Sequence, residues 1–215
     1  MRVLLVAPPG AGKGTQGVVI ASHFGVPHIA TGDLLRDHVA RGTPLGEQVR
    51  GHLDRGELVP DDVVLQMVRE RFDDLEADGW VLDGIPRTLA QARALYELAR
   101  ERDTTADVAL HLKVSDDELV RRLLARAAVS GRSDDTEDVI RRRLALYYEV
   151  THPILDWYEE RGILVSVDAE RPAHLVGRHI LTALEVVRQV LESAPDVPRR
   201  AIDLSALGAA LEELT

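Results

Sequence analysis

Residues 7–15, Ala-Pro-Pro-Gly-Ala-Gly-Lys-Gly-Thr, constrain the fold of this chain more than any other stretch. They follow an apolar run at residues 3–6 and precede a segment, residues 16–24, whose pattern predicts a helix. In a strand–turn–helix unit of this kind, the backbone N–H groups of the turn and the positive end of the helix converge on phosphate. Lys13 can reach the outer phosphates of a bound polyphosphate. The stretch therefore predicts a phosphate-binding loop in an α/β fold.

Five short apolar runs separated by helical patterns predict buried parallel strands at residues 3–6, 27–30, 80–83, 108–114 and 163–167. Helices between such strands cover both faces of the sheet, and ligands bind at the carboxyl ends of the strands. Three of these ends carry polar motifs, at residues 7–15, 31–33 and 83–87. We therefore expect one ligand site at this edge.

The remaining segments predict smaller units around this core. Residues 31–60 predict two short helices, with Thr31 as the N-cap of the first, in an insert that projects from the core. Residues 127–134 predict a loop short enough to act as a flap, and residues 135–160 a helix interrupted near 151–153. After about residue 193, a linker precedes leucines at helical spacing. This tail either forms a helix that docks on the core or on a partner protein, or forms a helix that is only marginally stable by itself.

The composition of the chain limits which partners it could bind and in which cellular compartment it is expected. The chain has no cysteine, which excludes disulfides and cysteine-ligated zinc. No apolar run approaches a membrane span, and the N-terminal apolar run is too short for a signal peptide, so we expect a cytoplasmic protein. The net charge of −10 argues against a nucleic-acid partner. The arginines at 121–122, 126, 132 and 141–143 nevertheless form a local cluster that suits a small anion, although a solvated helix face has the same pattern.

Five separated motifs occur in the order typical of one family: Pro-Gly-Ala-Gly-Lys-Gly-Thr-Gln at 9–16, Thr-Gly-Asp-Leu-Leu-Arg at 31–36, Leu-Val-Pro-Asp at 58–61, Asp-Gly-Ile-Pro-Arg at 83–87 with Gln91, and Gly-Arg-x-Asp-Asp at 131–135 with Arg143. Over residues 1–190 the chain resembles the adenylate kinases of the nucleoside monophosphate kinase superfamily. The resemblance implies reversible transfer, ATP + AMP = 2 ADP, with Mg²⁺. It also implies a three-layer P-loop fold with a five-stranded parallel sheet, a helical NMP-binding insert and a short lid.

The resemblance also implies domain boundaries and partners. The core would comprise residues 1–29, 60–125 and 134–193, the NMP-binding insert 30–59, and the short lid 126–133. Residues 194–215 form an extension with no counterpart in the family pattern. Its role is not assigned, and a contact surface is one option. The partners implied are ATP, AMP and ADP, with no zinc, nucleic acid or membrane, and we expect a monomer.

The family's functional residues carry over onto matching positions. The ATP site would comprise Gly10, Ala11, Gly12, Lys13, Gly14, Thr15, Arg126 and Arg171. The AMP site would comprise Thr31, Arg36, Glu57, Leu58, Val59, Gly84, Ile85, Pro86, Arg87, Gln91, Arg132 and Arg143. The catalytic cations would be Lys13, Arg87, Arg122, Arg126, Arg132 and Arg143. Asp83 would bind a water on Mg²⁺, or a metal-bound phosphate.

Two positions depart from the pattern. Ala7 replaces a glycine, and its methyl group would crowd the loop if its φ were positive. Ile85 replaces an aromatic residue beside the AMP site. Neither substitution removes a charged group from the implied site.

Two alternative functions fit parts of this pattern. A pyrimidine nucleoside monophosphate kinase of the UMP/CMP type would share the fold, but Thr31 and Gln91 favour adenine. An ATP-binding regulatory protein with an inactive kinase site would use the C-terminal helix as its working surface. The retained Lys13 and arginines argue against it, because unused like charges in a cleft repel one another.

Overall fold

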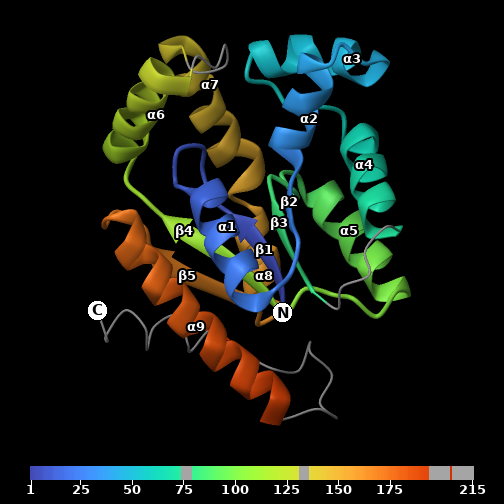
Figure 1. Ribbon diagram of the computed structural model, residues 1–215, viewed down its shortest axis with the longest axis vertical. Coiled ribbons are helices and arrows are strands. Elements are labelled where there is room, and N and C mark those ends of the chain that lie inside the picture. The colour runs from blue at the N-terminus through green and yellow to red at the C-terminus, as the bar shows by residue number, and fades with distance from the viewer. Residues whose placement is uncertain (74–78, 131–135, 194–203, 205–215) are drawn as a thin grey trace.

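A computed structural model of the chain describes residues 1–73, 79–130, 136–193 and Leu204 (Figure 1). Its centre is a sheet of five parallel strands: β1 (Arg2–Val6), β2 (His28–Ala30), β3 (Trp80–Asp83), β4 (Val108–Lys113) and β5 (Leu164–Asp168). The strand order is β2-β3-β1-β4-β5. All five predicted strands are confirmed to within a residue or two.

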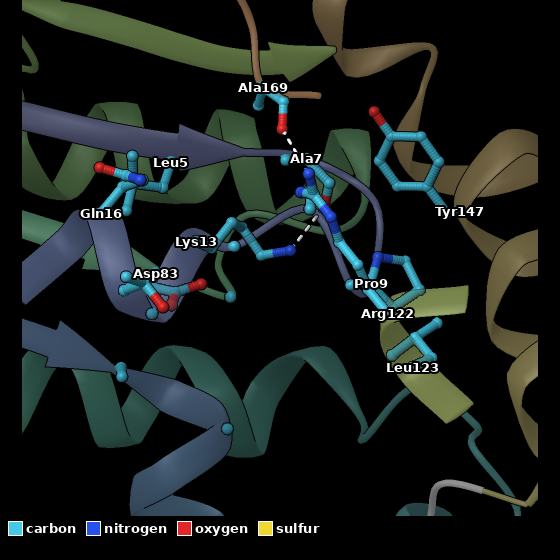
Figure 2. Close-up of a pocket in the computed structure, with 18 of the residues that line it drawn as sticks. Leu5, Ala7, Pro9, Lys13, Gln16, Asp83, Arg122, Leu123, Tyr147 and Ala169 are labelled. Carbon is cyan, nitrogen blue, oxygen red and sulfur yellow. Dashed lines mark hydrogen bonds between the residues drawn. The ribbon is translucent and has the colours of Figure 1, made fainter. Parts of the chain in front are cut away.

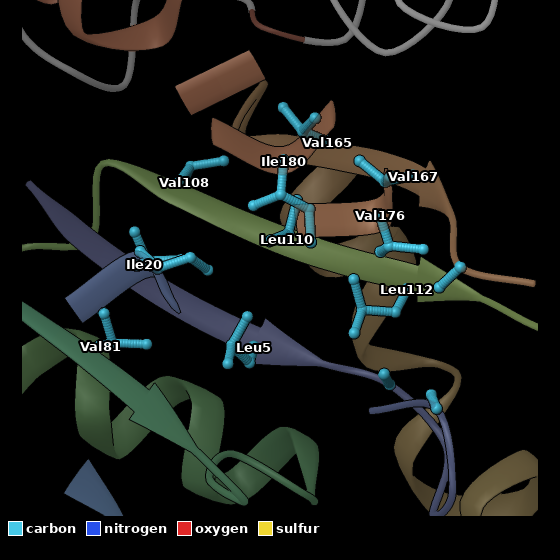
Figure 3. Close-up of a cluster of buried hydrophobic side chains, with 14 of the residues drawn as sticks. Leu5, Ile20, Val81, Val108, Leu110, Leu112, Val165, Val167, Val176 and Ile180 are labelled. Atoms are coloured by element: carbon cyan, nitrogen blue, oxygen red, sulfur yellow. The ribbon is translucent and has the colours of Figure 1, made fainter. Parts of the chain in front are cut away.

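Helices cover both faces of the sheet, so the fold has three layers. Alternate residues of each strand point to opposite faces. Val3 and Leu5 of β1 join the core cluster that also contains Ile20 and Ile180, whereas Leu4 joins the cluster on the other face (Figure 3). The first cluster packs against α1 (Lys13–Phe24), α6 (Asp116–Ser130), α7 (Glu137–Leu146) and α9 (Ala173–Ser193). The second packs against α2 (Thr31–Ala40), α3 (Pro44–Asp54), α4 (Asp61–Asp73), α5 (Leu89–Glu101) and α8 (Ile154–Glu159).

Three predicted boundaries are corrected. The first helix begins at Lys13 rather than at residue 16. Thr31 is the first residue of α2, and Ala30 is its N-cap. α6 continues to Ser130, so the first four residues of the loop predicted over 127–134 are helical. Ala127 and Ala128 explain this continuation, because alanine has the highest helix propensity. The rest of that loop, residues 131–134, and the 131–135 motif lie outside the described residues.

Two further predictions about helices are confirmed. Residues 31–60 contain two short helices, α2 and α3, as expected of an insert. Thr43 caps α3, its hydroxyl accepting a hydrogen bond from the Gly46 amide (3.1 Å). The long helical pattern after residue 135 is interrupted where expected, because a π-helical turn, η1 (Tyr147–Thr151), separates α7 from α8.

In the part of the chain that the structure describes, no helix combines the length and the apolar character needed to cross a membrane.

Leu204 is the one described residue of the C-terminal extension, and it is buried in the core. Its side chain is 1 % exposed and belongs to the cluster shared by β1, β4, β5 and α9. Its amide donates a hydrogen bond to the carbonyl of Gly162 (2.6 Å), just before β5. The rest of the tail, including the three other leucines of the predicted stripe, lies outside the described residues. At Leu204, the extension contributes to the core.

The substitution Leu204→Ala is therefore expected to lower the free energy of unfolding by about 2–4 kcal/mol, because it removes a fully buried side chain from a packed cluster. Thermal denaturation measures this loss. Leu124→Ala, at a leucine on α6 that is 44 % exposed, is the matched control and should change stability by less than about 1 kcal/mol. Equal effects of the two substitutions would contradict the burial of Leu204.

Candidate functional site

A cavity of about 970 Å³ opens at the carboxyl edge of the sheet. The loop after β1, the start of α1, the ends of β2 and β3, and residues of α6 and α7 all line it. Figure 2 shows Lys13, Asp83 and Arg122 around this loop. The three polar strand ends expected to share one site therefore do so.

The glycine-rich loop owes its shape to two glycines with positive φ. Gly10 has φ 88° and Gly12, the N-cap of α1, has φ 96°. A Cβ atom at Gly10 would also lie 2.9 Å from Cγ of Leu123, which is closer than carbon atoms can pack. Ala7 is buried, and among the described residues only Asp103 is a non-glycine residue with positive φ. The alanine at position 7 therefore does not strain the loop.

Lys13 lies at the centre of the loop and is held by it. Its Nζ donates hydrogen bonds to the carbonyls of Ala7 (2.7 Å) and Pro8 (3.0 Å). Burial lowers the pKa of Lys13 to about 8, partly opposed by Asp83, while nearby arginine charges lower the pKa further. A partly buried ammonium of this kind attracts an incoming anion, because water screens it less than it screens a surface charge.

This pKa predicts a pH dependence for anion binding at the loop. Because the folded value of about 8 lies below the unfolded value of 10.5, the unfolded chain holds the extra proton between these two pH values. The Lys13 contribution to the free energy of unfolding therefore rises with pH across that range. Binding of a polyphosphate favours the protonated amine, so its Kd should increase above about pH 8, by up to about tenfold.

Calorimetric titration of ATP between about pH 7 and pH 9.5 measures this increase. The same titration of Lys13→Met is the control and should lack it. A wild-type Kd that is flat across this range would contradict the lowered pKa.

Three predicted arginines face the same cavity as Lys13. Arg87, Arg126 and Arg143 all line it, and the charge of each lowers the pKa of Lys13. Arg87 follows β3, Arg126 lies on α6 and Arg143 lies on α7, so three separate elements bring positive charge to one place. Arg132, the sixth predicted cation, lies outside the described residues.

Arg122 lies at the cavity wall, with partners of its own. Its guanidinium contacts a carboxylate oxygen of Glu118 (2.6 Å) and donates to the carbonyls of Ala169 (2.9 Å) and Glu170 (3.1 Å). Hydrogen bonds from Arg121 and Arg122 lower the pKa of Glu118 to about 2, so this carboxylate stays charged. In this arrangement Arg122 fixes the segment after β5, and its predicted catalytic role remains a prediction.

A second, smaller cavity of about 40 Å³ adjoins the first on the side of the insert. Most of the predicted AMP residues line it: Thr31, Arg36, Glu57, Leu58, Val59, Gly84, Arg87, Gln91 and Arg143. Five of them also line the large cavity: Arg36, Leu58, Gly84, Arg87 and Arg143. The three arginines therefore lie where the two cavities meet. The structure thus brings these predicted residues together.

Two predicted AMP residues stand apart from the smaller cavity. Pro86 lines the large cavity instead. The side chain of Ile85 is fully buried in the second core cluster, against neither cavity. Its apolar character reflects packing, so only the backbone at this position could face a ligand.

The polar side chains of the smaller cavity are held in place by the protein itself. Thr31 donates its hydroxyl proton to the Asp83 carbonyl (3.2 Å), which joins the ends of β2 and β3. Arg36 contacts Asp33 (2.6 Å). The Gln91 side chain accepts a hydrogen bond from the Arg87 amide (2.7 Å) and donates one to Asp61 (2.7 Å).

Sequence reasoning assigned no role to two residues that support this site. Asp61 holds Gln91 and also accepts the hydroxyl proton of Thr88 (2.8 Å). Thr151, in η1, donates a hydrogen bond to the carbonyl of Arg87 (2.9 Å). Asp61 lies within the 58–61 motif, whereas the contact between Thr151 and Arg87 spans 64 residues and has no local signal.

Asp83 is 9 % exposed and lines the large cavity beside the start of α1. Its Oδ2 lies 3.9 Å from Nε2 of His28, a buried nitrogen without a hydrogen-bond partner among the described residues. No group of three or more histidine, cysteine or acidic side chains forms a metal cage in the described part of the chain. One carboxylate beside a phosphate-binding loop fits Mg²⁺, which keeps several waters and binds through one or two carboxylates plus substrate phosphates.

Comparisons of the sequence with known proteins point to one family. A sequence model of a family described as adenylate kinase matches residues 5–163. The chain is 47 % identical over 187 residues to an adenylate kinase of Thermobifida fusca, covering 86 % of this chain and 98 % of that protein. It is 51 % identical over 166 residues to an adenylate kinase of Thermus thermophilus, covering 77 % and 87 %. An adenylate kinase of a Nocardioides species is 47 % identical over 188 residues, covering 87 % and 98 %.

Proposed function

The chain belongs to the adenylate kinase family and is a phosphotransferase, and we propose that its two adjoining cavities hold ATP and AMP for the reaction ATP + AMP = 2 ADP. The main support for assigning the two nucleotides to these cavities is a set of shared arginines. The cavity of the glycine-rich loop and the cavity of the insert share Arg36, Arg87 and Arg143 at their junction. Positive charge is therefore concentrated where the terminal phosphates of two nucleotides would meet.

On the ATP side, the loop from Gly10 to Thr15 would wrap the phosphates. The N–H groups at the start of α1 and the ammonium of Lys13 supply donors and charge. Lys13 would exchange its two bonds to loop carbonyls for bonds to phosphate oxygens. Arg126 would contact the outer phosphates, and the backbone at Arg171 would lie against the base.

On the AMP side, Arg36 and Arg87 would grip the phosphate. Guanidinium groups match phosphate oxygens with two parallel hydrogen bonds, which fixes orientation as well as position. Thr31 and Gln91 would contact adenine, supported by the backbone at 57–59 and Gly84. The Gln91 amide can do so while it keeps Arg87 and Asp61, because its NH2 group has a second N–H and its oxygen a second lone pair.

The transfer breaks the bond between the γ-phosphorus and the β–γ bridging oxygen of ATP, and an oxygen of AMP forms the new bond. Charge in the transition state spreads over the oxygens of the moving group, so the protein's contribution is alignment and electrostatic stabilisation. Lys13, Arg87, Arg122, Arg126, Arg132 and Arg143 would provide that stabilisation. Mg²⁺, when bound, supplies further positive charge on the phosphates, and Asp83 would hold one of its waters.

We further propose that the insert, residues 30–59, and a lid over residues 126–133 close on the nucleotides, with residues 1–29, 60–125 and 134–193 as the core. Closure would exclude water and bring the arginines onto the phosphates. Glu57 contacts both Arg55 (2.8 Å) and Arg142 of α7 (2.8 Å), so an ion pair links the insert to the other wall. We also propose a cytoplasmic monomer that acts on ATP, AMP and ADP.

A coupled assay of ADP formation with AMP, UMP, CMP and GMP as acceptors tests the proposal. We expect AMP to react fastest, because Thr31 and Gln91 offer partners for adenine. Fastest turnover with a pyrimidine nucleotide would assign the chain a UMP/CMP-type specificity instead. Tight ATP binding without ADP formation would support a regulatory protein with an inactive site.

A further inference from the structure

The segment that joins β5 to α9, residues 169–173, forms one wall of the large cavity, and we call it the base wall. The protein holds this wall at both ends. Arg122 donates to the carbonyls of Ala169 and Glu170 at its start. At its other end, the side chain of Gln16 donates from Nε2 to the carbonyl of Ala173 (3.0 Å).

Gln16 connects the helix that follows the phosphate loop to this wall. It lies in the first turn of α1, three residues after Lys13, and its side chain is 2 % exposed. Its partner Ala173 begins α9 and is 157 residues away in the sequence. One hydrogen bond therefore ties the helix that begins at the phosphate loop to the helix that begins at the base wall.

The oxygen of the Gln16 amide, unlike its nitrogen, has no hydrogen-bond partner in the described part of the chain. Because a carbonyl can accept only from the amide nitrogen, the contact with Ala173 fixes the oxygen, Oε1, on the other side. This Oε1 is also buried. Leaving a buried acceptor unpaired is costly, and an apolar side chain of the same length would avoid the cost. The glutamine is thus poorly explained by packing alone.

The backbone of α9 makes room for this arrangement. A Cβ atom at Gly177 would lie 3.1 Å from Oε1 of Gln16, a tighter contact than most carbon atoms make. It would also lie 3.6 Å from Val19, the next α1 side chain at this helix contact. Glycine at position 177 therefore leaves room for Oε1 of Gln16, and a Cβ atom there would require the amide to shift by a few tenths of an ångström.

From these contacts we propose that Gln16 is a positioning residue that sets the base preference of the ATP site. The inference rests on the proposed function, in which the base wall lies against the base of ATP. With Gln16 holding Ala173, the wall keeps a fixed distance from the phosphate loop, so a nucleotide gripped by its phosphates presents its base edge in one register. Adenine and guanine present different donors and acceptors at that edge, so one fixed register favours one base over the other. Under the proposed function, the favoured base is adenine.

The substitution Gln16→Met tests this, because it removes the donor and keeps the volume. With AMP as acceptor, kcat/KM for ATP should fall about tenfold, whereas kcat/KM for GTP should change by less than about twofold. The ATP/GTP ratio should therefore fall about tenfold, while KM for AMP stays unchanged. Gly177→Ala, which displaces the amide from the α9 side, should lower the same ratio and provides a second route if the methionine variant does not fold.

Val19→Ala is the matched control, because it loosens the same helix contact without touching the hydrogen bond. It should lower thermal stability and leave the ATP/GTP ratio unchanged. Loss of ATP and GTP activity in equal proportion in Gln16→Met would make Gln16 a packing residue and overturn the inference. A wild-type enzyme that forms no ADP from ATP and AMP would instead contradict the proposed function, so the two failures are distinguishable.

Discussion

Replacing Lys13 by methionine is expected to lower kcat by on the order of 10²-fold or more, with a much smaller loss of nucleotide binding. The ammonium lies half-buried in the loop and lines the same cavity as Arg87 and Arg143. In the transition state negative charge shifts onto the β–γ bridging oxygen and spreads over the oxygens of the moving group. An ammonium beside these oxygens would stabilise the transition state more than it stabilises bound ATP. Methionine has a similar length and fills the same space without the charge.

Steady-state kinetics with ATP and AMP, together with calorimetric binding of ATP, separate the two effects. Lys113→Met is the matched control, since Lys113 is exposed at the end of β4 and does not line the cavity. It should retain wild-type kcat. A Lys13→Met enzyme with near-normal kcat would show that the loop lysine does not act on the transferring group.

Arg87→Ala is expected to impair the AMP side by a comparable factor, with kcat/KM for AMP falling by about 10²-fold or more. Arg87 lies at the junction of the two cavities, and its Nε donates to the Gly84 carbonyl (2.8 Å). The Thr151 hydroxyl holds its backbone from the other side. In the proposed function, removing the guanidinium takes away an oriented partner of the acceptor phosphate, whereas the loop proposed to bind ATP keeps all of its groups.

The effect should be confined to AMP, with the Kd of ATP within about threefold of wild type. Arg100→Ala, at an exposed arginine of the adjoining helix α5 that pairs with Glu97, is the control and should alter neither value. If Arg87→Ala weakened ATP and left AMP unaffected, the assignment of the two cavities would be reversed.

The sequence was sufficient to predict the sheet and the edge at which the large cavity lies. Buried parallel strands are continuous apolar runs, and the polar motif that follows each run has to lie at the carboxyl edge. The loop at 7–15, Thr31 and Asp83 could therefore be placed together from the order of runs and motifs alone. The arginines of α6 and α7 form a visible cluster in the sequence, but only the resemblance assigned them to the site, because helix spacing does not say what a helix packs against.

Most of the features that the sequence did not predict are tertiary contacts. The hydrogen bond from Gln16 to Ala173 and that from Thr151 to Arg87 join distant residues through single atoms, and no periodicity records such pairs. The ion pair of Arg122 with Glu118 could have been predicted, because an acidic and a basic side chain four residues apart on a helix lie on the same face. Ile85 looked like a site residue because it lies inside a polar motif, yet its side chain packs in the core.

In the proposed function, the two adjoining cavities hold two nucleotides whose terminal phosphates face each other at the shared arginines. Calorimetric titration with a bisubstrate ligand, two adenosines joined through five phosphates, tests it most directly. We expect one ligand per chain, bound at least about 10²-fold more tightly than ATP or AMP and displacing both, because linking the two nucleotides removes the cost of gathering them. Binding of two ligands per chain, or an affinity no higher than that of ATP, would contradict the claim.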